Sequence, residues 1–208
     1  GRLVTADNSM QWQYYRRDLP LVGWVLEIAN VLTFNFLPQW QVRLVTARFA
    51  EDLPAELTML PGGCMAIRKE TLDEVGLLDE DFFLLYEDVE WCRRIKNAGW
   101  KLYYCPDAAF THEGGASVST WSSASLVGQS LTSCLLFLHK HYRASVVVAA
   151  RVALLLLLTS YLLMLAATGR ARRSRARQIV LAERLRYIRL VWARQAYVRR
   201  HARWNECI

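Results

Sequence analysis

Short apolar runs alternate with turn signals over the first part of the chain, and long apolar and basic runs follow them. Asp7-Asn8-Ser9 predicts a turn between short extended pieces. Residues 20–41 are apolar and aromatic, and their spacing predicts a helix that ends before Pro38. The segment is either such a helix covering a globular core or a loop that touches the membrane or lines the acceptor site. Residues 43–57 show no clear period.

Residues 58–112 carry a regular series of element signals. Residues 64–67 form a short apolar run that predicts a buried strand. Gly62 and Gly63 precede that run and permit either a positive φ or the close approach of a backbone or ligand, although a simple bulge is equally possible. Residues 68–75 predict a short helix that Gly76 stops, and residues 87–98 predict another that Gly99 stops. Residues 100–105 and 108–111 predict two strands, and His112 follows the second.

The C-terminal third is apolar first and basic afterwards. Residues 122–142 predict a helix, and residues 144–168 approach or exceed the ~20 apolar residues that a spanning helix needs. Three placements remain open for this second segment: spanning the membrane, lying in its plane, or packing as a buried helix. Residues 178–200 predict a basic helix with one apolar stripe, which favours a surface-lying membrane anchor over nucleic-acid recognition.

Composition changes this picture in two respects. The chain has 208 residues and a net charge of +7, and most of the positive excess follows Gly169, where arginine dominates and only Glu183 and Glu206 oppose it. This tail therefore predicts an anionic partner, and a membrane surface fits better than nucleic acid. Five cysteines without zinc-site spacings indicate reduced thiols in a cytosolic compartment. The chain begins at Gly1 without a signal-like segment, and we expect it to be a piece of a longer protein.

An acidic pair and one histidine are the candidate chemical groups. Glu87 and Asp88 stand at the predicted start of a helix, where the helix dipole alone would favour negative charge. A carboxylate held between the aromatic run before it and the glycine-lined run could also act as a general base. His112 is either a hydrogen-bonded packing residue or a metal ligand. The first alternative is favoured, because the local pattern contains no second ligand.

The order of these signals resembles the C-terminal half of GT-A-type family 2 glycosyltransferases, especially the bacterial rhamnosyltransferase-like branch. Residues 75–80 (VGLLDE), 82–100 (FFLLYEDVEWCRRIKNAGW) and 104–117 (YCPDAAFTHEGGAS) follow the family's successive motifs. Residues 7–11 and 16–20 resemble its opening segment. The likeness therefore extends over most of residues 1–142.

The resemblance implies roles for individual residues. Asp88 matches the catalytic base, which would take a proton from an acceptor hydroxyl during an in-line, inverting displacement, and Glu87 is its acidic neighbour. His112 matches a position that helps to bind the metal or the diphosphate. The remaining positions implied to contact substrate are Gly62, Gly63, Glu90, Arg93 and Arg94. For the two arginines a structural ion pair is at least as good an explanation, and Glu90 stands where aspartate is common.

One departure from the family is large. The nucleotide-binding βαβ unit and the Asp-x-Asp metal motif that precede this region in the family have no counterpart here, and Asp79 and Asp81 fall in the wrong place to supply the motif. We therefore expect an α/β fold in which residues 1–142 form the acceptor-side part of a GT-A domain and residues 143–208 form apolar and basic C-terminal helices. We expect this chain alone to be inactive, and a divalent cation, Mg²⁺ or Mn²⁺, to act only in the complete enzyme.

Two functions follow from this reading. The first is transfer of a sugar from a nucleotide-diphospho-sugar to a lipid-linked or cell-envelope glycan acceptor, at the cytoplasmic face of the plasma membrane. The second is a non-catalytic, membrane-anchored remnant or interaction module of the same fold. No nucleic-acid partner is expected.

Overall fold

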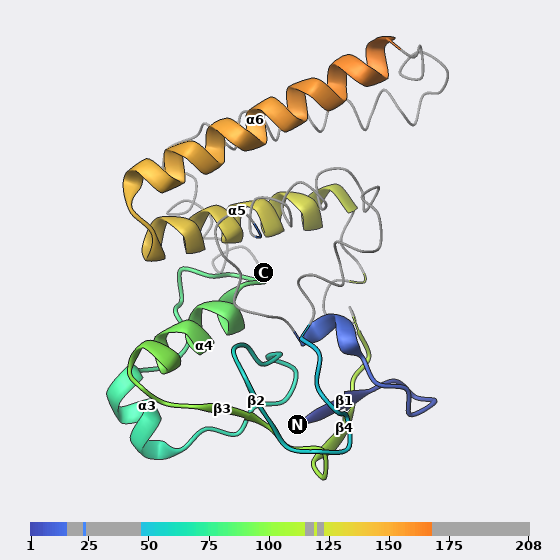
Figure 1. Ribbon diagram of the computed structural model, residues 1–208, viewed down its shortest axis with the longest axis vertical. Helices are drawn as coiled ribbons and strands as arrows, with labels where there is room; N and C mark the ends of the chain where they lie inside the picture. Colours follow the sequence, from blue (N-terminus) through green and yellow to red (C-terminus); the bar gives the residue numbers. More distant parts are fainter. Residues whose placement is uncertain (16–22, 24–46, 115–118, 120–122, 168–208) are drawn as a thin grey trace, which may run out of the picture. The chain divides into compact units, whose positions relative to one another are not determined.

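The computed structural model describes residues 1–15, 23, 47–114, 119 and 123–167 (Figure 1). They fall into two compact units, one formed by residues 1–15, 47–114 and 119, the other by residues 23 and 123–167. The helix predicted within residues 20–37 lies, apart from Gly23, outside the described residues. The predicted basic helix over residues 178–200 lies outside them as well.

The first unit contains two small sheets. Strand β1 (Arg2–Val4) pairs in parallel with β4 (Ala109–Thr111), with Leu3 opposite Phe110. Strand β2 (Ala55–Leu57) pairs antiparallel with β3 (Leu102–Tyr104). The strands expected over residues 100–105 and 108–111 are thus confirmed in shorter form, whereas β2 falls in the stretch where the sequence shows no period.

The core of this unit is aromatic and lies against β1 and β3. Tyr15 and Tyr104 are fully buried, and their rings meet edge-on at a centroid distance of 5.5 Å. Each hydroxyl is satisfied: Tyr15 accepts from the Leu3 N–H at 2.8 Å and donates to the Gly1 carbonyl at 2.6 Å, and Tyr104 donates to the Glu51 carbonyl at 2.8 Å. Buried tyrosines need such partners, so this core fixes the start of the chain against β3.

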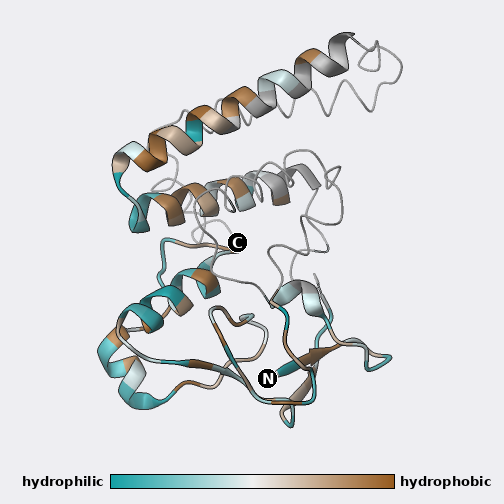
Figure 2. Cartoon of the chain, in the orientation of Figure 1, coloured by the Kyte–Doolittle hydropathy of each residue, from teal (hydrophilic) through white to brown (hydrophobic). Residues whose placement is uncertain are grey.

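Three helical elements accompany the sheets: the 3₁₀ turn η1 (Trp12–Tyr14) and the helices α3 (Lys69–Val75) and α4 (Glu87–Asn97). Gly76 follows α3 with a φ of 81°, and Gly99 closes the turn after α4 with a φ of 88°, which confirms both predicted helix stops. Figure 2 shows hydrophobic and hydrophilic residues alternating along α4. Its buried residues are Val89, Glu90, Cys92 and Ile95.

The strand predicted over residues 64–67 is wrong. These residues have no regular secondary structure, and none of the four is fully buried. A strand forms only where a neighbouring strand offers its hydrogen-bonding edge. In the described part of the chain β1 pairs with β4 and β2 with β3, so this run has no strand partner.

The second unit contains the helices α5 (Ser123–His141) and α6 (Ala144–Ala167), which confirm two helices predicted from apolar content. The connection between them is tight, because the Arg143 carbonyl accepts from the backbone N–H of Val146 and of Val147. Leu131, Cys134, Phe137 and Leu138 of α5 are buried. Within the described residues, no helix combines the length and apolar character needed to cross a membrane.

Candidate active site

Helix α4 begins after a strained turn. Leu85 has a φ of 66° and Tyr86 a φ of 71°, so two consecutive side-chain-bearing residues adopt the left-handed region. Each such residue costs roughly 1–2 kcal/mol because its Cβ approaches the following carbonyl oxygen. The Tyr86 side chain makes no capping hydrogen bond that would explain the conformation locally. The turn places Glu87 and Asp88 in the first turn of the helix, and strain of this kind gathers at functional sites.

The carboxylate of Asp88 binds the loop that contains Gly62 and Gly63, which we call the glycine loop. Its Oδ2 accepts the Gly62 backbone N–H at 2.8 Å, and its Oδ1 accepts the Val89 N–H at 2.8 Å. A Cβ built on Gly62 would lie 3.2 Å from Asp88 Cβ and 3.4 Å from Oδ2. Gly62 therefore serves close approach and not a positive φ. Each carboxylate oxygen keeps a further lone pair, so the group can still accept a proton or a hydrogen bond.

Cys92, one helical turn after Asp88, holds the same loop at a second point. Its sulfur accepts from the Leu60 N–H at 3.4 Å and lies 3.7 Å from the Leu60 carbonyl oxygen. Burial raises the pKa of the Cys92 thiol to about 12, so this group stays a neutral thiol and is not a nucleophile at neutral pH. One face of α4 thus fixes the loop over Leu60 and Gly62.

Glu87 is the less well-solvated carboxylate of the pair. Its Oε2 atom is buried, and it has no hydrogen-bond partner among the described residues. Burial raises the pKa of Glu87, and the neighbouring charge of Asp88 raises it further. The two acidic residues therefore differ: Asp88 is held by two backbone donors, whereas Glu87 has one buried oxygen without a hydrogen-bond partner.

Glu90 and Arg94 form a buried ion pair inside the first unit. Glu90 is 2% exposed, and both of its carboxylate oxygens accept from Arg94 Nε, at 2.9 and 2.8 Å. The other two guanidinium nitrogens of Arg94 donate to the carbonyls of Val75 and Leu77, at 2.6 and 2.8 Å. This is the structural ion pair that the sequence allowed. A substrate contact by Glu90, by Arg94 or by the half-buried Arg93 stays a prediction.

His112 directly follows β4 and is held by contacts with three residues. Its backbone N–H donates to the Val4 carbonyl at 2.9 Å. Its Nδ1 lies 2.8 Å from Gln11 Oε1, and Gln11 Nε2 donates to the His112 carbonyl at 2.7 Å. The Tyr14 ring meets the imidazole edge-on, at a centroid distance of 5.0 Å. A Cβ built on Gly63 would lie 3.3 Å from His112 Cδ2 and 3.5 Å from Nε2.

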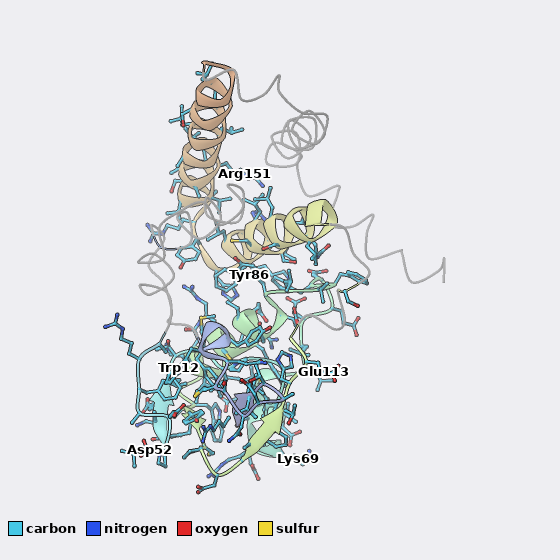
Figure 3. All side chains as sticks on the ribbon, turned by 90° about the vertical axis from the view of Figure 1, so that its right-hand side faces the viewer. Trp12, Asp52, Lys69, Tyr86, Glu113 and Arg151 are labelled. Carbon is cyan, nitrogen blue, oxygen red and sulfur yellow. The ribbon has the colours of Figure 1, made fainter. Side chains whose placement is uncertain are left out.

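The glycine loop brings two predicted site residues to neighbouring positions. Gly62 contacts Asp88 and the next residue, Gly63, contacts His112. Neither glycine has a positive φ. In the side-on view of Figure 3, the labelled Trp12 and Glu113 mark the two segments next to Gln11 and His112. Gln11 ends the opening segment over residues 7–11, and nothing in the neighbouring sequence indicates its contact with His112, 101 residues away.

The described residues do not make a metal centre. No group of three or more histidine, cysteine or acidic side chains in this part of the chain could hold a metal ion. His112 offers one nitrogen, and the Asp88 oxygens already bind backbone N–H groups. A divalent cation needs several ligands, so the role of His112 as a metal ligand stays a prediction.

Comparison with known proteins shows which proteins the chain is similar to. Residues 36–131 match the family described as Glycosyltransferase like family 2. The chain is 29% identical over 127 residues to an N-acetylglucosaminyl-diphospho-decaprenol L-rhamnosyltransferase of Mycobacterium tuberculosis (strain H37Rv), which covers 60% of this chain and 40% of that protein. It is 39% identical over 49 residues to the dTDP-rhamnosyl transferase RfbF of Shigella flexneri. The aligned region covers 24% of this chain and 17% of that protein.

No solved structure matches the chain significantly. The chain spans only 40% of the length of the mycobacterial relative. A family 2 domain implies a GT-A α/β fold, in agreement with the small sheets and helices of the first unit. Over residues 36–131 the chain is therefore similar to family 2 glycosyltransferases, and both relatives named above are rhamnosyltransferases.

Proposed function

We propose that this chain contributes the acceptor side of an inverting sugar-transfer site, with Asp88 as the general base. The donor would be a nucleotide-diphospho-sugar and the acceptor a lipid-linked or cell-envelope glycan. The names of two relatives, one acting on a diphospho-decaprenol-linked sugar and one a dTDP-rhamnosyl transferase, support these classes. The observation that carries the proposal is the Asp88 carboxylate, held by two backbone donors beside two consecutive glycines.

Asp88 has the chemistry that the reaction needs. A sugar hydroxyl is a poor nucleophile until a positioned group accepts its proton. In the proposed step the acceptor oxygen forms a bond to the anomeric carbon, and its proton passes to Asp88. The bond from that carbon to the diphosphate breaks on the opposite face, and the electron pair leaves with the nucleoside diphosphate. The fixed carboxylate supplies orientation as well as basicity.

A divalent cation, Mg²⁺ or Mn²⁺, is expected for the family and would stabilise charge on the departing diphosphate. The described residues do not supply a ligand set for it. Gly62 and Gly63 fit a surface that a sugar ring approaches, because neither has a side chain that would cover Asp88 or His112.

We also propose that the basic C-terminal run places the protein at the cytoplasmic face of the plasma membrane. The support is the arginine excess after Gly169, which favours anionic headgroups. Sedimentation of the full chain with phosphatidylcholine vesicles, with and without phosphatidylglycerol, measures this. Equal binding to both vesicles would contradict the proposal.

The test of the base compares three variants of the natural gene product. Asp88→Asn should lower kcat by about 100- to 10,000-fold, the usual contribution of general-base catalysis. Glu87→Gln should cost less, and Asp73→Asn, the same change on the exposed face of α3, should cost nothing measurable. Thermal unfolding of each variant separates lost chemistry from lost loop anchoring.

The results have distinct meanings. If Asp88→Asn turns over at nearly the wild-type rate, the assigned base is wrong. If the wild-type gene product releases no nucleoside diphosphate from any nucleotide-sugar in the presence of a polyprenyl-diphosphate-linked acceptor, the non-catalytic module becomes the better description.

A further inference from the structure

Gln11 is buried, and both polar atoms of its side chain contact the same residue, His112. It is 4% exposed, and both ends of its amide contact His112: Nε2 contacts the backbone carbonyl and Oε1 contacts the ring. Its own backbone is fixed on β1, because its N–H donates to the Leu3 carbonyl at 3.0 Å. A buried glutamine costs free energy unless its amide is paired, so a polar residue here calls for a reason.

The hydrogen-bond pattern determines which ring nitrogen carries the proton. A carbonyl oxygen only accepts, so the amide atom 2.7 Å from the His112 oxygen must be the NH₂ group of Gln11. The other amide atom, 2.8 Å from Nδ1, is then the oxygen, which also only accepts. Nδ1 must therefore be the donor. In the neutral imidazole this leaves Nε2 without a proton and with a free lone pair.

Other contacts keep the ring in this orientation. The His112 backbone is bound to β1 through Val4, and the Tyr14 ring stands at 84° to the imidazole. The edge that contains Nε2 faces Gly63, where a side chain would crowd it. Within the described residues, Nε2 makes no hydrogen bond. The free lone pair of His112 Nε2 therefore lies next to the space that a side chain at Gly63 would fill.

We propose that Gln11 is a positioning residue that holds neutral His112 in the tautomer protonated at Nδ1, so that Nε2 acts as an electron-pair donor beside Gly63. Nε2 then binds an electron-pair acceptor, either a sugar hydroxyl proton or a cation. A diphosphate oxygen is excluded while the ring is neutral, because two lone pairs would face each other. The tautomer follows from the contacts alone, whereas its use in sugar transfer rests on the proposed function.

The tautomer is measurable without any activity assay. The full chain is labelled with ¹⁵N in its histidine rings, and two-bond ¹H–¹⁵N correlation spectra are recorded at about pH 8. Comparison with His112→Asn assigns the signals. The wild-type spectrum should show a pyrrole-like Nδ1 and a pyridine-like Nε2 for His112. A protonated Nε2 in the wild-type protein overturns the proposal.

Two substitutions test whether Gln11 sets the tautomer. Gln11→Met keeps the length of the side chain and removes both contacts, and it should shift the tautomer ratio toward Nε2–H by about tenfold, the effect of one net hydrogen bond. Gln11→Glu keeps an acceptor at Nδ1 and should retain the wild-type tautomer. Gln129→Met, the same change on α5, should leave His112 unaltered. An unchanged ratio in folded Gln11→Met contradicts the proposal.

Two additions to the wild-type sample identify the chemistry at Nε2. A shift of the Nε2 signal with Mg²⁺ alone would assign a cation as its partner. Inorganic pyrophosphate alone should not place a proton on Nε2, and a bound state that does so contradicts the proposal. If sugar transfer is absent and the tautomer is as expected, the proposed function fails and the role of Gln11 stands.

Discussion

Two ion pairs of the first unit each join residues one helical turn apart and differ strongly in burial, so they allow a comparison. Arg94 Nε lies 2.8 Å from Glu90 Oε2, and Lys69 Nζ lies 2.7 Å from Asp73 Oδ1, both across one helical turn. The side chains of the first pair are 26% and 3% exposed, and those of the second are 80% and 62% exposed. The perturbation is Arg94→Ala, with Lys69→Ala as its control.

The expected magnitudes follow from burial. An exposed pair one turn apart contributes about 0.3–0.5 kcal/mol, so Lys69→Ala should hardly change the free energy of unfolding. Arg94→Ala deprives a buried carboxylate of its guanidinium, which costs about 3–5 kcal/mol. Because a quarter of the Arg94 side chain is exposed, we expect the lower end, about 3 kcal/mol. Arg94→Lys should fall between, because a lysine cannot also bind the carbonyls of Val75 and Leu77.

Hydrogen exchange of the α4 amides is the appropriate measurement. The chain forms two units, so a global unfolding signal would mix their transitions, whereas these amides report the first unit. A loss of protection in Arg94→Ala no larger than in Lys69→Ala would refute the reasoning. It would mean that the buried pair contributes no more than an exposed one.

Two further outcomes follow from the backbone and from Glu87. Gly76 has a φ of 81° and a ψ of 179°, and a Cβ there would meet only Arg94 Nη1, at 3.9 Å. Gly76→Ala should therefore lower the free energy of unfolding by about 1–3 kcal/mol through backbone strain alone. An unchanged urea denaturation curve would contradict this expectation. The raised pKa of Glu87 means that its stabilising contribution is complete below pH 4.5 and is lost as the pH rises through the folded pKa. Glu87→Gln should therefore unfold at a higher temperature than wild type at neutral pH and at the same temperature below pH 4.5, and a difference independent of pH would argue against the desolvation of Glu87.

Much of the local structure could be predicted from neighbouring residues. The stops at Gly76 and Gly99, the start of α4 at the acidic pair and the strands around Tyr103 and Phe110 depend on signals within a few positions. Helix ends and strand propensities act over that range, since caps and side-chain periodicity involve residues one to four apart. The order of the motifs, with Asp88 and His112 among them, resembles the glycosyltransferase family without any knowledge of the geometry.

The tertiary structure decided what those residues contact. The apolar run over residues 64–67 has strand composition, yet it has no strand beside it and stays irregular. The sequence left open whether Gly62 served conformation or close approach, and the Asp88 carboxylate 26 residues away gives the answer. Gln11 meets His112 across 101 residues. Periodicity carries no information about such pairs, because a hydrogen bond between distant segments exists only once the chain has folded and brought them together.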